Sequence, residues 1–552
     1  MTTNGPPAAV PHQEHMFPTL TAAQIARIKP FALERRFTDG QSLWIQGDSN
    51  RPLHVVVEGG IEILSGKDHV VTVHDAGGFS GDVDLLSGRP VVVGARARGA
   101  TRVLELPAEK VRSLVQTDVE LSEILLRAFI LRRSALMAQG QGSIVLLGSQ
   151  HCATTLGLRE FLARNNQPHA YIDLDTDDDV QATLDGFGVG LGDIPVVICL
   201  GERILRRPTI EELGECLGLN RLNQDLVHDL VVVGAGPAGL AAAVYAASEG
   251  LDVLVVESSA PGGQAGSSSR IENYLGFPTG VTGQELTNSA LVQAEKFGAE
   301  LVVARTAARL FCERRPYAVD LGGGASVQAR TAIIATGARY RKPDLANLGR
   351  FEGVGIYYGA TQIEANLCSG EDVIVVGGGN SAGQAAVFLA SRGSQVHMLV
   401  RGAGLAESMS RYLIRRIEEA PNITLRTRTK IVALEGDRQL RGVTWENAAS
   451  GERTTVDNRH VFLMTGASPN SAWLGGCLAL DEKGFIKTGQ DLPAEDLAAA
   501  GWTLTRPPHL FETSYPGIFA VGDVRANSVK RVAAAVGEGS VCVQLVHRVL
   551  AE

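Results

Sequence analysis

The sequence predicts a multidomain chain that contains a β-roll with helices, a small α/β domain and two three-layer α/β domains. Three observations support this fold class. Gly-rich turns at 234–239 and 377–382 each follow a β-branched strand run and precede an Ala-rich helical run. Short alternating strands punctuated by glycine fill residues 53–97. Strand and helix patterns alternate over residues 143–218, and a chain of 552 residues is too long for one core.

The composition argues against several classes of function. The formal net charge is −9 and no basic stripe is evident, so we expect no nucleic-acid partner, because phosphate backbones are bound by clustered Lys and Arg. The N-terminal residues lack a positive segment followed by an apolar one, so we expect a cytoplasmic protein without a membrane anchor. The seven cysteines include no C-x-x-C pair, and we expect no metal site.

The first Gly-rich turn has the pattern that holds a dinucleotide. Its glycines stand where the chain turns tightly and where the backbone approaches a pyrophosphate. The next strand ends at Glu257, about 20 residues later, where a carboxylate accepts the ribose hydroxyls of an unphosphorylated adenosine. We therefore predict an FAD site that includes Gly234, Gly236, Pro237, Ala238, Gly239 and Glu257.

The second Gly-rich turn has the same pattern with a different charge after it. The strand that follows ends at Arg401, and a cation there can pair with the 2′-phosphate of NADPH. The predicted NADPH site consists of Gly377, Gly379, Asn380, Ser381, Ala382 and Arg401. In the alternative interpretation Arg401 is a solvated residue at a strand end, which leaves NADH open.

Further motifs extend this pattern over residues 228–552. They are Gly262-Gly263-Gln264, Glu272-Asn273-Tyr274, Ala335-Thr336-Gly337-Ala338, Gly522-Asp523-Val524, and Lys530-Arg531-Val532 with Ala535. Together with the two turns, they resemble the thioredoxin reductase family, which has the class-II pyridine nucleotide-disulfide oxidoreductase fold of two Rossmann-like domains. The resemblance implies a homodimer in which NADPH reduces FAD. It implies FAD contacts at Gly263, Gln264, Asn273, Ala335, Thr336, Gly337, Gly522, Asp523, Arg531, Val532 and Ala535, with Asp523 on the ribityl chain.

The redox dithiol of that family is absent. In the stretch that would carry it, residues 355–362, Gly359 and Gln362 occupy the positions of the two cysteines. Neither side chain is a nucleophile, so electrons cannot leave by thiolate exchange, and we do not expect disulfide reduction. Tyr357 and Tyr358 precede this position and either stack near the flavin or serve packing.

The electron acceptor therefore stays open. A small oxidant at the flavin, the thiol of Cys152, or a partner protein are the three candidates. An interpretation of a different class is a redox or nucleotide sensor, or a regulatory scaffold, that holds FAD without turnover.

The middle segment resembles a glutaredoxin, a thioredoxin-like α/β fold. Residues 143–162 fit its first strand, active-site turn and helix, and residues 193–198 fit the strand after its cis-proline. Cys152 falls on the nucleophilic position and Thr155 on the resolving one. A thiol at a helix N-terminus can have a lowered pKa and form a mixed disulfide. The alternative is a vestigial thiol in a domain kept for packing.

Residues 40–115 resemble a cyclic-nucleotide-binding domain. The phosphate cassette decides binding in such domains, and here Phe79-Ser80-Gly81-Asp82 is followed by Arg89, while apolar Val91 falls where the phosphate-binding arginine belongs. We therefore expect a docking or dimerising scaffold and no cyclic nucleotide.

The predicted boundaries follow these motifs. They are a disordered tail over 1–16, a cyclic-nucleotide-binding-like domain over 17–139, a glutaredoxin/thioredoxin-like domain over 143–222, an FAD-binding domain over 228–345 and 465–552, and an NADPH-binding domain over 346–464. One continuous helix is expected over 108–137.

Overall fold

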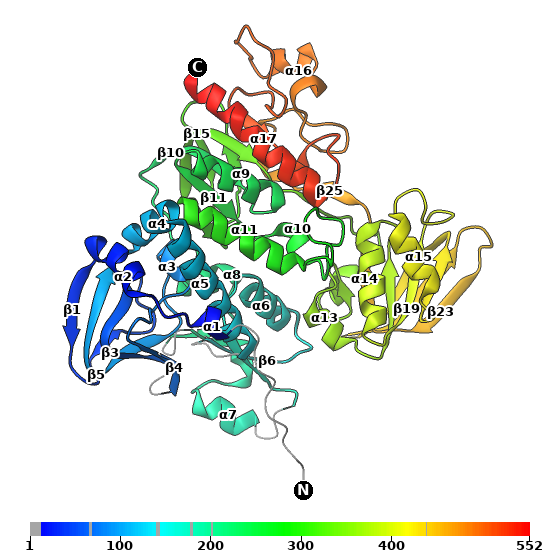
Figure 1. Ribbon diagram of the computed structural model, residues 1–552. Helices are drawn as coiled ribbons and strands as arrows, with labels where there is room; N and C mark the ends of the chain where they lie inside the picture. Colours follow the sequence, from blue (N-terminus) through cyan, green and yellow to red (C-terminus); the bar gives the residue numbers. More distant parts are fainter. Residues whose placement is uncertain (1–12, 66–68, 140–143, 177–179, 200–202, 438) are drawn as a thin grey trace. The chain divides into compact units, whose positions relative to one another are not determined.

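The computed structural model describes residues 13–65, 69–139, 144–176, 180–199, 203–437 and 439–552 (Figure 1). Contacts divide the chain into two compact units. Unit 1 comprises Met1–Gly148, Asn165–Leu219 and Glu295–Gly298, and unit 2 comprises Ser149–Arg164, Asn220–Ala294 and Ala299–Glu552. The predicted domain boundaries are finer than this division and stay predictions. Within the residues described, no helix is both long and apolar enough to span a membrane.

Unit 1 begins with the β-roll. Its antiparallel sheet has the order β1-β5-β3-β4, with β2 also on β5. Buried side chains of β2, β3 and β5 form its core around Trp44. The elements are α1 (Gln13–Met16), α2 (Ala22–Ile28), β1 (Leu33–Phe37), β2 (Ser42–Trp44), β3 (Leu53–Ser65), β4 (His69–Asp75), α3 (Asp84–Ser87) and β5 (Gly94–Leu106). Helix α1 falls at the end of the predicted tail, and residues 1–12 of that tail lie outside the described residues.

The prediction of one continuous helix over 108–137 is wrong. The structure has two helices, α4 (Ala108–Thr117) and α5 (Val119–Gln139). Asp118 between them is extended, with φ −110° and ψ 102°. Its carboxylate accepts a hydrogen bond from the backbone N–H of Leu121 at 3.1 Å, so it ends one helix and caps the next.

The rest of unit 1 contains a four-stranded sheet of order β7-β6-β8-β9. β6 (Ile144–Gly148) and β7 (His169–Asp173) are parallel, while β8 (Val196–Cys199) and β9 (Arg203–Arg206) are antiparallel. A cis Ile194–Pro195 bond precedes β8, α7 spans Val180–Gly186, and a disulfide joins Cys199 to Cys216 at the end of α8 (Ile210–Cys216). The assignment of this segment as glutaredoxin-like stays a prediction.

The first sheet of unit 2 has seven strands in the order β12-β11-β10-β15-β14-β13, with β26 beside β15. The centres of β10 and β11 are buried Val and Leu, as expected for parallel strands covered on both faces. The strands are β10 (Val227–Val233), β11 (Val253–Glu257), β12 (Glu300–Val303), β13 (Arg309–Phe311), β14 (Tyr317–Asp320), β15 (Ser326–Ile334) and β26 (Ile518–Ala520). The helices include α6 (Ala153–Arg164), α9 (Pro237–Ser248), α10 (Gly263–Gly266), α11 (Gly283–Phe297), α16 (Ala494–Ala499) and α17 (Val532–Ala551).

A second parallel sheet, β17-β24-β18-β19-β20, is inserted between β15 and β26. The chain enters and leaves the insertion through β16 (Ala338–Tyr340) and β25 (Ala467–Pro469), which pair antiparallel. The inserted elements are α12 (Leu348–Phe351), β17 (Ile356–Tyr357), α13 (Gln362–Leu367), β18 (Asp372–Val376), α14 (Asn380–Ser391), β19 (Gln395–Val400), α15 (Arg411–Glu419), β20 (Ile423–Thr427), β21 (Thr429–Gly436), β22 (Leu440–Asn447), β23 (Arg453–Asp457) and β24 (His460–Leu463). The sheet that follows the second Gly-rich turn is thus inserted into the sheet that carries the first, as the predicted split of the FAD-binding segment requires.

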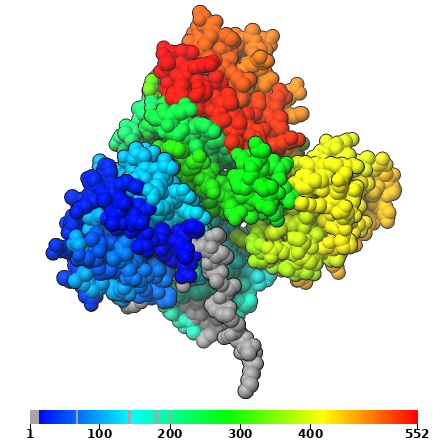
Figure 2. All heavy atoms as spheres, viewed as in Figure 1, coloured from blue at the N-terminus to red at the C-terminus, as the bar shows by residue number. Residues whose placement is uncertain are grey.

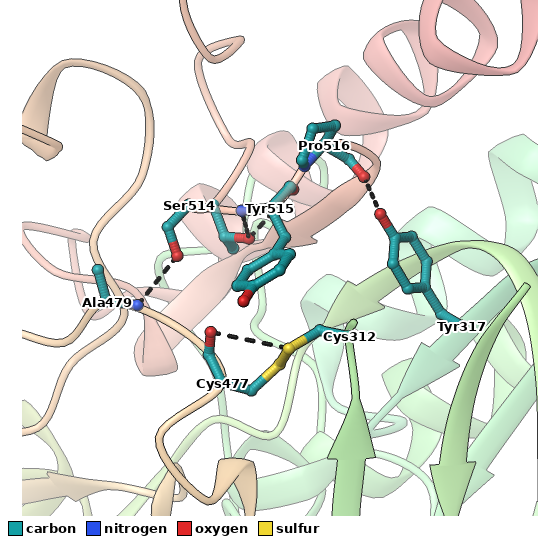
Figure 3. The surroundings of a disulfide bond; sticks show 8 residues. Cys312, Tyr317, Cys477, Ala479, Ser514, Tyr515 and Pro516 are labelled. Atoms are coloured by element: carbon teal, nitrogen blue, oxygen red, sulfur yellow. Dashed lines mark hydrogen bonds between the residues drawn. A yellow bond between two sulfur atoms is a disulfide. The ribbon is translucent and has the colours of Figure 1, made fainter. Parts of the chain in front are cut away.

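A disulfide joins Cys312, just after β13, to Cys477 in the loop before the C-terminal strand (Figure 3). Close by, the backbone N–H of Ala479 donates to Ser514 at 3.1 Å, and the Tyr317 hydroxyl donates to the carbonyl of Pro516. The sequence did not reveal this pair or Cys199–Cys216, because neither follows a local cysteine motif. The loop carrying Cys477 is thereby fixed to the first sheet of unit 2.

Helices α9 and α17 pack closely in unit 2, as the green and red helices of Figure 1 show. Gly539 allows this approach, because a Cβ there would lie 2.1 Å from the carbonyl oxygen of Ala238. The opposite face of α17 is exposed, with Val541 at 51% and the red segment visible at the surface in Figure 2.

We expect Gly539→Ala to lower the free energy of unfolding by about 1–3 kcal/mol, because the added methyl forces the two helices apart. Gly537→Ala is the matched control. It adds the same methyl two residues away on the exposed face of α17, where nothing lies within 4 Å, so it is expected to be neutral or to stabilise by up to about 1 kcal/mol. Thermal unfolding of both variants measures the difference, and equal effects would contradict the packing role of Gly539.

Candidate functional site

The first Gly-rich turn forms a tight backbone cradle between β10 and α9. Gly234 has φ +105°, and a Cβ there would lie 2.4 Å from the carbonyl oxygen of Ala335. A Cβ on Gly239 would lie 1.9 Å from the carbonyl oxygen of Gly234. Gly236 precedes α9 with no side-chain cap, and Pro237 is the first helical residue. The first amides of α9 are thus left to an external anion such as a pyrophosphate.

Glu257 lies beside this cradle at the end of β11. One carboxylate oxygen accepts the backbone N–H of Ala235 at 2.8 Å, and the other accepts that of Ser259 at 3.0 Å. These bonds hold the carboxylate at the strand end where the sequence predicts the adenosine ribose. The residues therefore fit an unphosphorylated adenine dinucleotide such as FAD.

Three small residues meet at the open side of the cradle. A Cβ on Gly522, which has φ +73°, would lie 3.0 Å from the Cβ of Ala238 and 3.8 Å from that of Ala535. Asp523 follows directly, and burial raises the pKa of its carboxyl, opposed by nearby Lys530. The sequence-predicted residues Gly522, Ala238 and Ala535 are thus brought together.

Two other predicted segments are also fixed near the cradle. The Thr336 hydroxyl donates to the carbonyl of Asn470 at 2.8 Å, and the Asn470 amide donates to the carbonyl of Thr336 at 2.9 Å, which ties the start of the insertion to its end. Gly337 follows with φ +64°. A Cβ on Gly263 would lie 3.1 Å from Cα of Gly236.

The remaining predicted FAD residues differ in burial. Gln264 donates its side-chain amide to the carbonyl of Ala338. Val532 is the first residue of α17 and is half-buried, whereas Arg531 and Asn273 are exposed. Contacts of these residues with FAD stay predictions.

The second Gly-rich turn forms a similar cradle before α14. Gly377 has φ +146°, and a Cβ there would lie 2.4 Å from the carbonyl oxygen of Met464. Gly379 precedes the helix without a side-chain cap, and nothing lies within 4 Å of the position of its Cβ. Asn380 accepts the backbone N–H of Ser410 at 2.7 Å, and Ala382 is fully buried. This cradle likewise fits a pyrophosphate.

Arg401 directly follows β19 and is exposed, at the strand end where the sequence predicts the 2′-phosphate. Its position suits a phosphate, but an exposed arginine at a strand end also needs no ligand. The choice of NADPH over NADH therefore stays a prediction.

A hollow lies at the position of the missing dithiol. Its lining is made of hydroxyl, amide and apolar groups without a thiol and includes Gln264, Ser267, Tyr340, Tyr358, Gly359 and Ser381. A Cβ on Gly359 would meet only Ser267, at 3.7 Å and 3.8 Å, which is ordinary contact. Gln362 begins α13 and accepts a hydrogen bond from Arg392 at 2.6 Å. The Cβ of a cysteine at 359 would therefore fit, and crowding at this atom does not explain the glycine.

Tyr358 belongs to a polar cluster that the sequence motifs do not reveal. Its hydroxyl donates to Glu352 at 2.5 Å, and the Lys342 ammonium lies 2.5 Å from the same carboxylate oxygen. Burial and the Glu352 carboxylate raise the pKa of Tyr358 well above its usual value. Tyr357, in contrast, is buried and lies against His460 and Phe462 with ring centroids 6.0 Å and 5.2 Å apart, so it serves packing.

Cys152 directly precedes α6 and is partly exposed. Burial opposes ionisation of its thiol, but the amide and hydroxyl groups of Thr155 and Thr154 outweigh burial and lower the pKa of Cys152. The other two free cysteines are buried. Burial raises the pKa of Cys368 to about 11 and raises that of Cys542 further. Cys152 is therefore the most readily ionised of the three free thiols.

Comparison with known proteins identifies the larger part of the chain. Residues 228–539, more than half of the 552, match the family described as pyridine nucleotide-disulphide oxidoreductase. The chain belongs to the pyridine nucleotide-disulphide oxidoreductase family. Residues 34–118 match the cyclic nucleotide-binding domain, which confirms the resemblance predicted for the β-roll.

Relatives within the pyridine nucleotide-disulphide oxidoreductase family confirm the likeness to thioredoxin reductase. The thioredoxin reductase of Bacillus subtilis is 30% identical over 331 residues, which are 60% of this chain and 97% of the relative. That of Mycolicibacterium smegmatis is 32% identical over 326 residues, 59% of this chain and 97% of the relative. The solved Lactococcus lactis thioredoxin reductase in its FR conformation has a TM-score of 0.52 at 26% identity and covers 59% of this chain and 99% of its own. Members of the family typically bind FAD and NAD(P)H.

The lowered pKa of Cys152 predicts selective alkylation. We expect N-ethylmaleimide to modify Cys152 before Cys368 in the folded protein, because the thiolate is the nucleophile. The rate of Cys152 modification should rise at a lower pH than that of an ordinary thiol, whose pKa is about 8.5. Thr155→Val removes one hydroxyl near the sulfur and is expected to move this rise to higher pH. Peptide mass spectrometry over a pH series measures both rates. A rise at or above the pH of a free peptide cysteine would contradict the prediction.

Proposed function

We propose that this chain is an FAD-dependent oxidoreductase that is reduced by NADPH and passes electrons on without a redox dithiol. The observation that carries the proposal is Gly359, which lies at a hollow without a thiol in a chain of the thioredoxin reductase-like family. The family assignment supports the two cofactors, and the missing cysteines argue against the family's thiol chemistry. We also propose a homodimer, as the resemblance implies.

Each of the two cradles would bind one cofactor. Glu257 and the first amides of α9 would hold FAD, and Arg401 and the first amides of α14 would hold NADPH. When bound, the nicotinamide supplies a hydride and the flavin accepts it. The Thr336–Asn470 hydrogen bonds tie the two ends of the insertion together.

A small oxidant such as a quinone or oxygen is the acceptor that the hollow supports best. Its lining of Ser267, Tyr340 and Gln264 presents hydroxyl and amide groups that can bind a polar oxygen but cannot form a mixed disulfide. The lowered pKa of Cys152 favours a second exit through that thiol. A separate redox protein is the third candidate.

A sensor without turnover is the second candidate function. The match of residues 34–118 to the cyclic nucleotide-binding domain favours it, because such a domain in a reductase chain suits a regulatory role. Turnover distinguishes the two, since a sensor would be reduced once and then stop.

Anaerobic stopped-flow reduction of the FAD-loaded protein by NADPH and by NADH tests the proposal. We expect the flavin absorbance to bleach with NADPH and to return on mixing with quinone or oxygen, at rates that Cys152→Ser leaves unchanged. Loss of reoxidation in Cys152→Ser would instead place the exit at that thiol. If neither nicotinamide bleaches the flavin, the enzyme proposal is wrong and the sensor takes its place.

Restoring the dithiol provides an independent test. Gly359→Cys with Gln362→Cys rebuilds a C-x-x-C pair where the backbone has room, so we expect reduction of a small aromatic disulfide to rise roughly tenfold or more above the wild type. Gly359→Ser with Gln362→Ser is the matched control, which loses the same Arg392 contact and adds no thiol. Wild-type disulfide reduction equal to that of the dithiol variant would overturn the proposed loss of thiol chemistry.

A further inference from the structure

The β-roll of unit 1 buries an unusual cluster of charges. Three arginines, Arg51, Arg132 and Arg133, surround the two carboxylates Asp82 and Asp84. The side chains of Arg51 and Arg133 are each 5% exposed, and those of Asp82 and Asp84 are 7% and 4% exposed. Charges removed this far from water need a partner for each sign.

Arg133 of α5 occupies both carboxylates. Its Nη2 donates to Asp82 Oδ2 at 2.8 Å and also bonds Asp84. Asp82 is the residue that falls on the ribose-binding position of the phosphate cassette, so this carboxylate already has an internal cation as its partner. The position of the missing cassette arginine is Val91, which is 1% exposed within the apolar cluster around Trp44.

Arg51 has no hydrogen-bonded partner for its side chain among the residues that the structure describes. Its Nη2 lies 3.6 Å from Asp82 Oδ1, and its Nε and Nη1 are buried without a hydrogen bond. Trp44 covers the guanidinium, whose carbon lies 4.7 Å from the ring centroid. An aromatic face attracts a cation but accepts none of these N–H bonds in a normal geometry.

Arg132 of α5 also has a buried nitrogen without a hydrogen bond. Its Nε and Nη1 donate to the carbonyls of Met16 and Gly81, each at 2.9 Å, while Nη2 is buried without a partner. Both Arg51 and Arg132 act on the same histidine: burial first, and then these two cations, lower the pKa of His74 to about 3. The Gly81 carbonyl that Arg132 contacts directly precedes Asp82, which lies 3.6 Å from Arg51, so the free donors belong to one region of the roll.

The charges of this region do not balance. Three guanidinium groups face two carboxylates, and a guanidinium does not lose its proton at neutral pH. His54 and His74 are neutral, because burial lowers the pKa of each to about 3. The neighbouring Arg89 is balanced separately by Glu295 at 3.1 Å. Within the described part of the roll, one positive charge is left over.

Two further carboxylates do not remove the excess. Glu105 lies 3.5 Å from His54 and 3.7 Å from Arg35, so it already faces an arginine outside the cluster. Glu62 is paired with Arg96 at 2.7 Å.

We propose that the β-roll binds a small oxyanion of the phosphate or sulfate type at the free donors of Arg51 and Arg132. Such an anion supplies the missing negative charge and accepts N–H bonds from both guanidinium groups. It links Arg51, two residues before β3, to Arg132 of α5. A cyclic nucleotide does not suit the site, because Asp82 is paired with Arg133 and Val91 offers no cation.

Isothermal titration calorimetry of the full FAD-loaded chain tests the site. The protein is first saturated with NADP⁺, so that the nucleotide cradles do not compete, and is then titrated with inorganic phosphate, sulfate, cAMP and cGMP in a chloride buffer. We expect phosphate or sulfate to bind and the cyclic nucleotides to give no heat. Arg51→Met is expected to weaken the anion roughly tenfold or more, and Arg51→Lys to weaken it less. Arg36→Met, at a side chain 83% exposed on β1, is the control and leaves binding unchanged.

Asp82→Asn distinguishes a binding site from a structural cluster. The change removes a competing carboxylate and raises the positive excess, so we expect the anion to bind several-fold more tightly although the domain is destabilised. Circular dichroism shows whether Arg51→Met folds. If it does not, anion binding by Asp82→Asn alone tests the site. Absence of anion binding in both the wild type and Asp82→Asn would overturn the proposal, as would binding of a cyclic nucleotide that depends on Arg51.

Discussion

The close approach of backbone at the start of α9 is the constraint on which the rest of unit 2 depends. One side of this helix is held by Gly239 against the carbonyl of Gly234, and the other by Gly539 of α17 against the carbonyl of Ala238. Neither contact leaves room for a Cβ. The first Gly-rich turn and α17 therefore belong to one packing arrangement. The turn leaves the first amides of α9 free for a pyrophosphate, and α17 packs against the same helix. Gly522, before α17, and Ala535, in its first turn, lie against the same residue: a Cβ on Gly522 would lie 3.0 Å from the Cβ of Ala238 and 3.8 Å from that of Ala535.

This constraint explains why the cradles could be predicted from the sequence. A glycine required by a close backbone contact has a fixed spacing from its strand and helix, so the motif is local. Glu257 and Arg401 were predicted in the same way, at the ends of the strands that follow, and their roles stay predictions. The FAD motifs that resume after residue 465 also predicted that the second sheet interrupts the first. The glutaredoxin-like segment and its Cys152 rest on similar local patterns, which no comparison yet tests.

The features that the sequence did not reveal come from residues that lie on separate elements or in the loops between them. The Tyr358–Glu352–Lys342 cluster, the Cys312–Cys477 disulfide and the Arg133–Asp82 pair each join separate elements. No spacing rule connects such residues, because the fold and not the local chain brings them together. The break at Asp118 was missed for a related reason: its capping bond to Leu121 competes with a helical pattern that continues on both sides.

Both parts with a matched family keep its scaffold and lack a group that its chemistry requires. In the reductase unit, a cysteine would fit at Gly359 with ordinary contacts, so the backbone is retained while the nucleophile is absent. In the β-roll, the shorter Asp82 stands at the position of the family's ribose-binding glutamate, an arginine of the same domain neutralises it, and Val91 replaces a cation. The two losses differ physically. The missing thiol leaves a hollow beside the predicted flavin. In the β-roll, Arg133 pairs with Asp82 of the phosphate cassette, and the unbalanced positive charge lies at Arg51 and Arg132. In our proposals, the first change alters where electrons can go, and the second alters which anion the domain can hold.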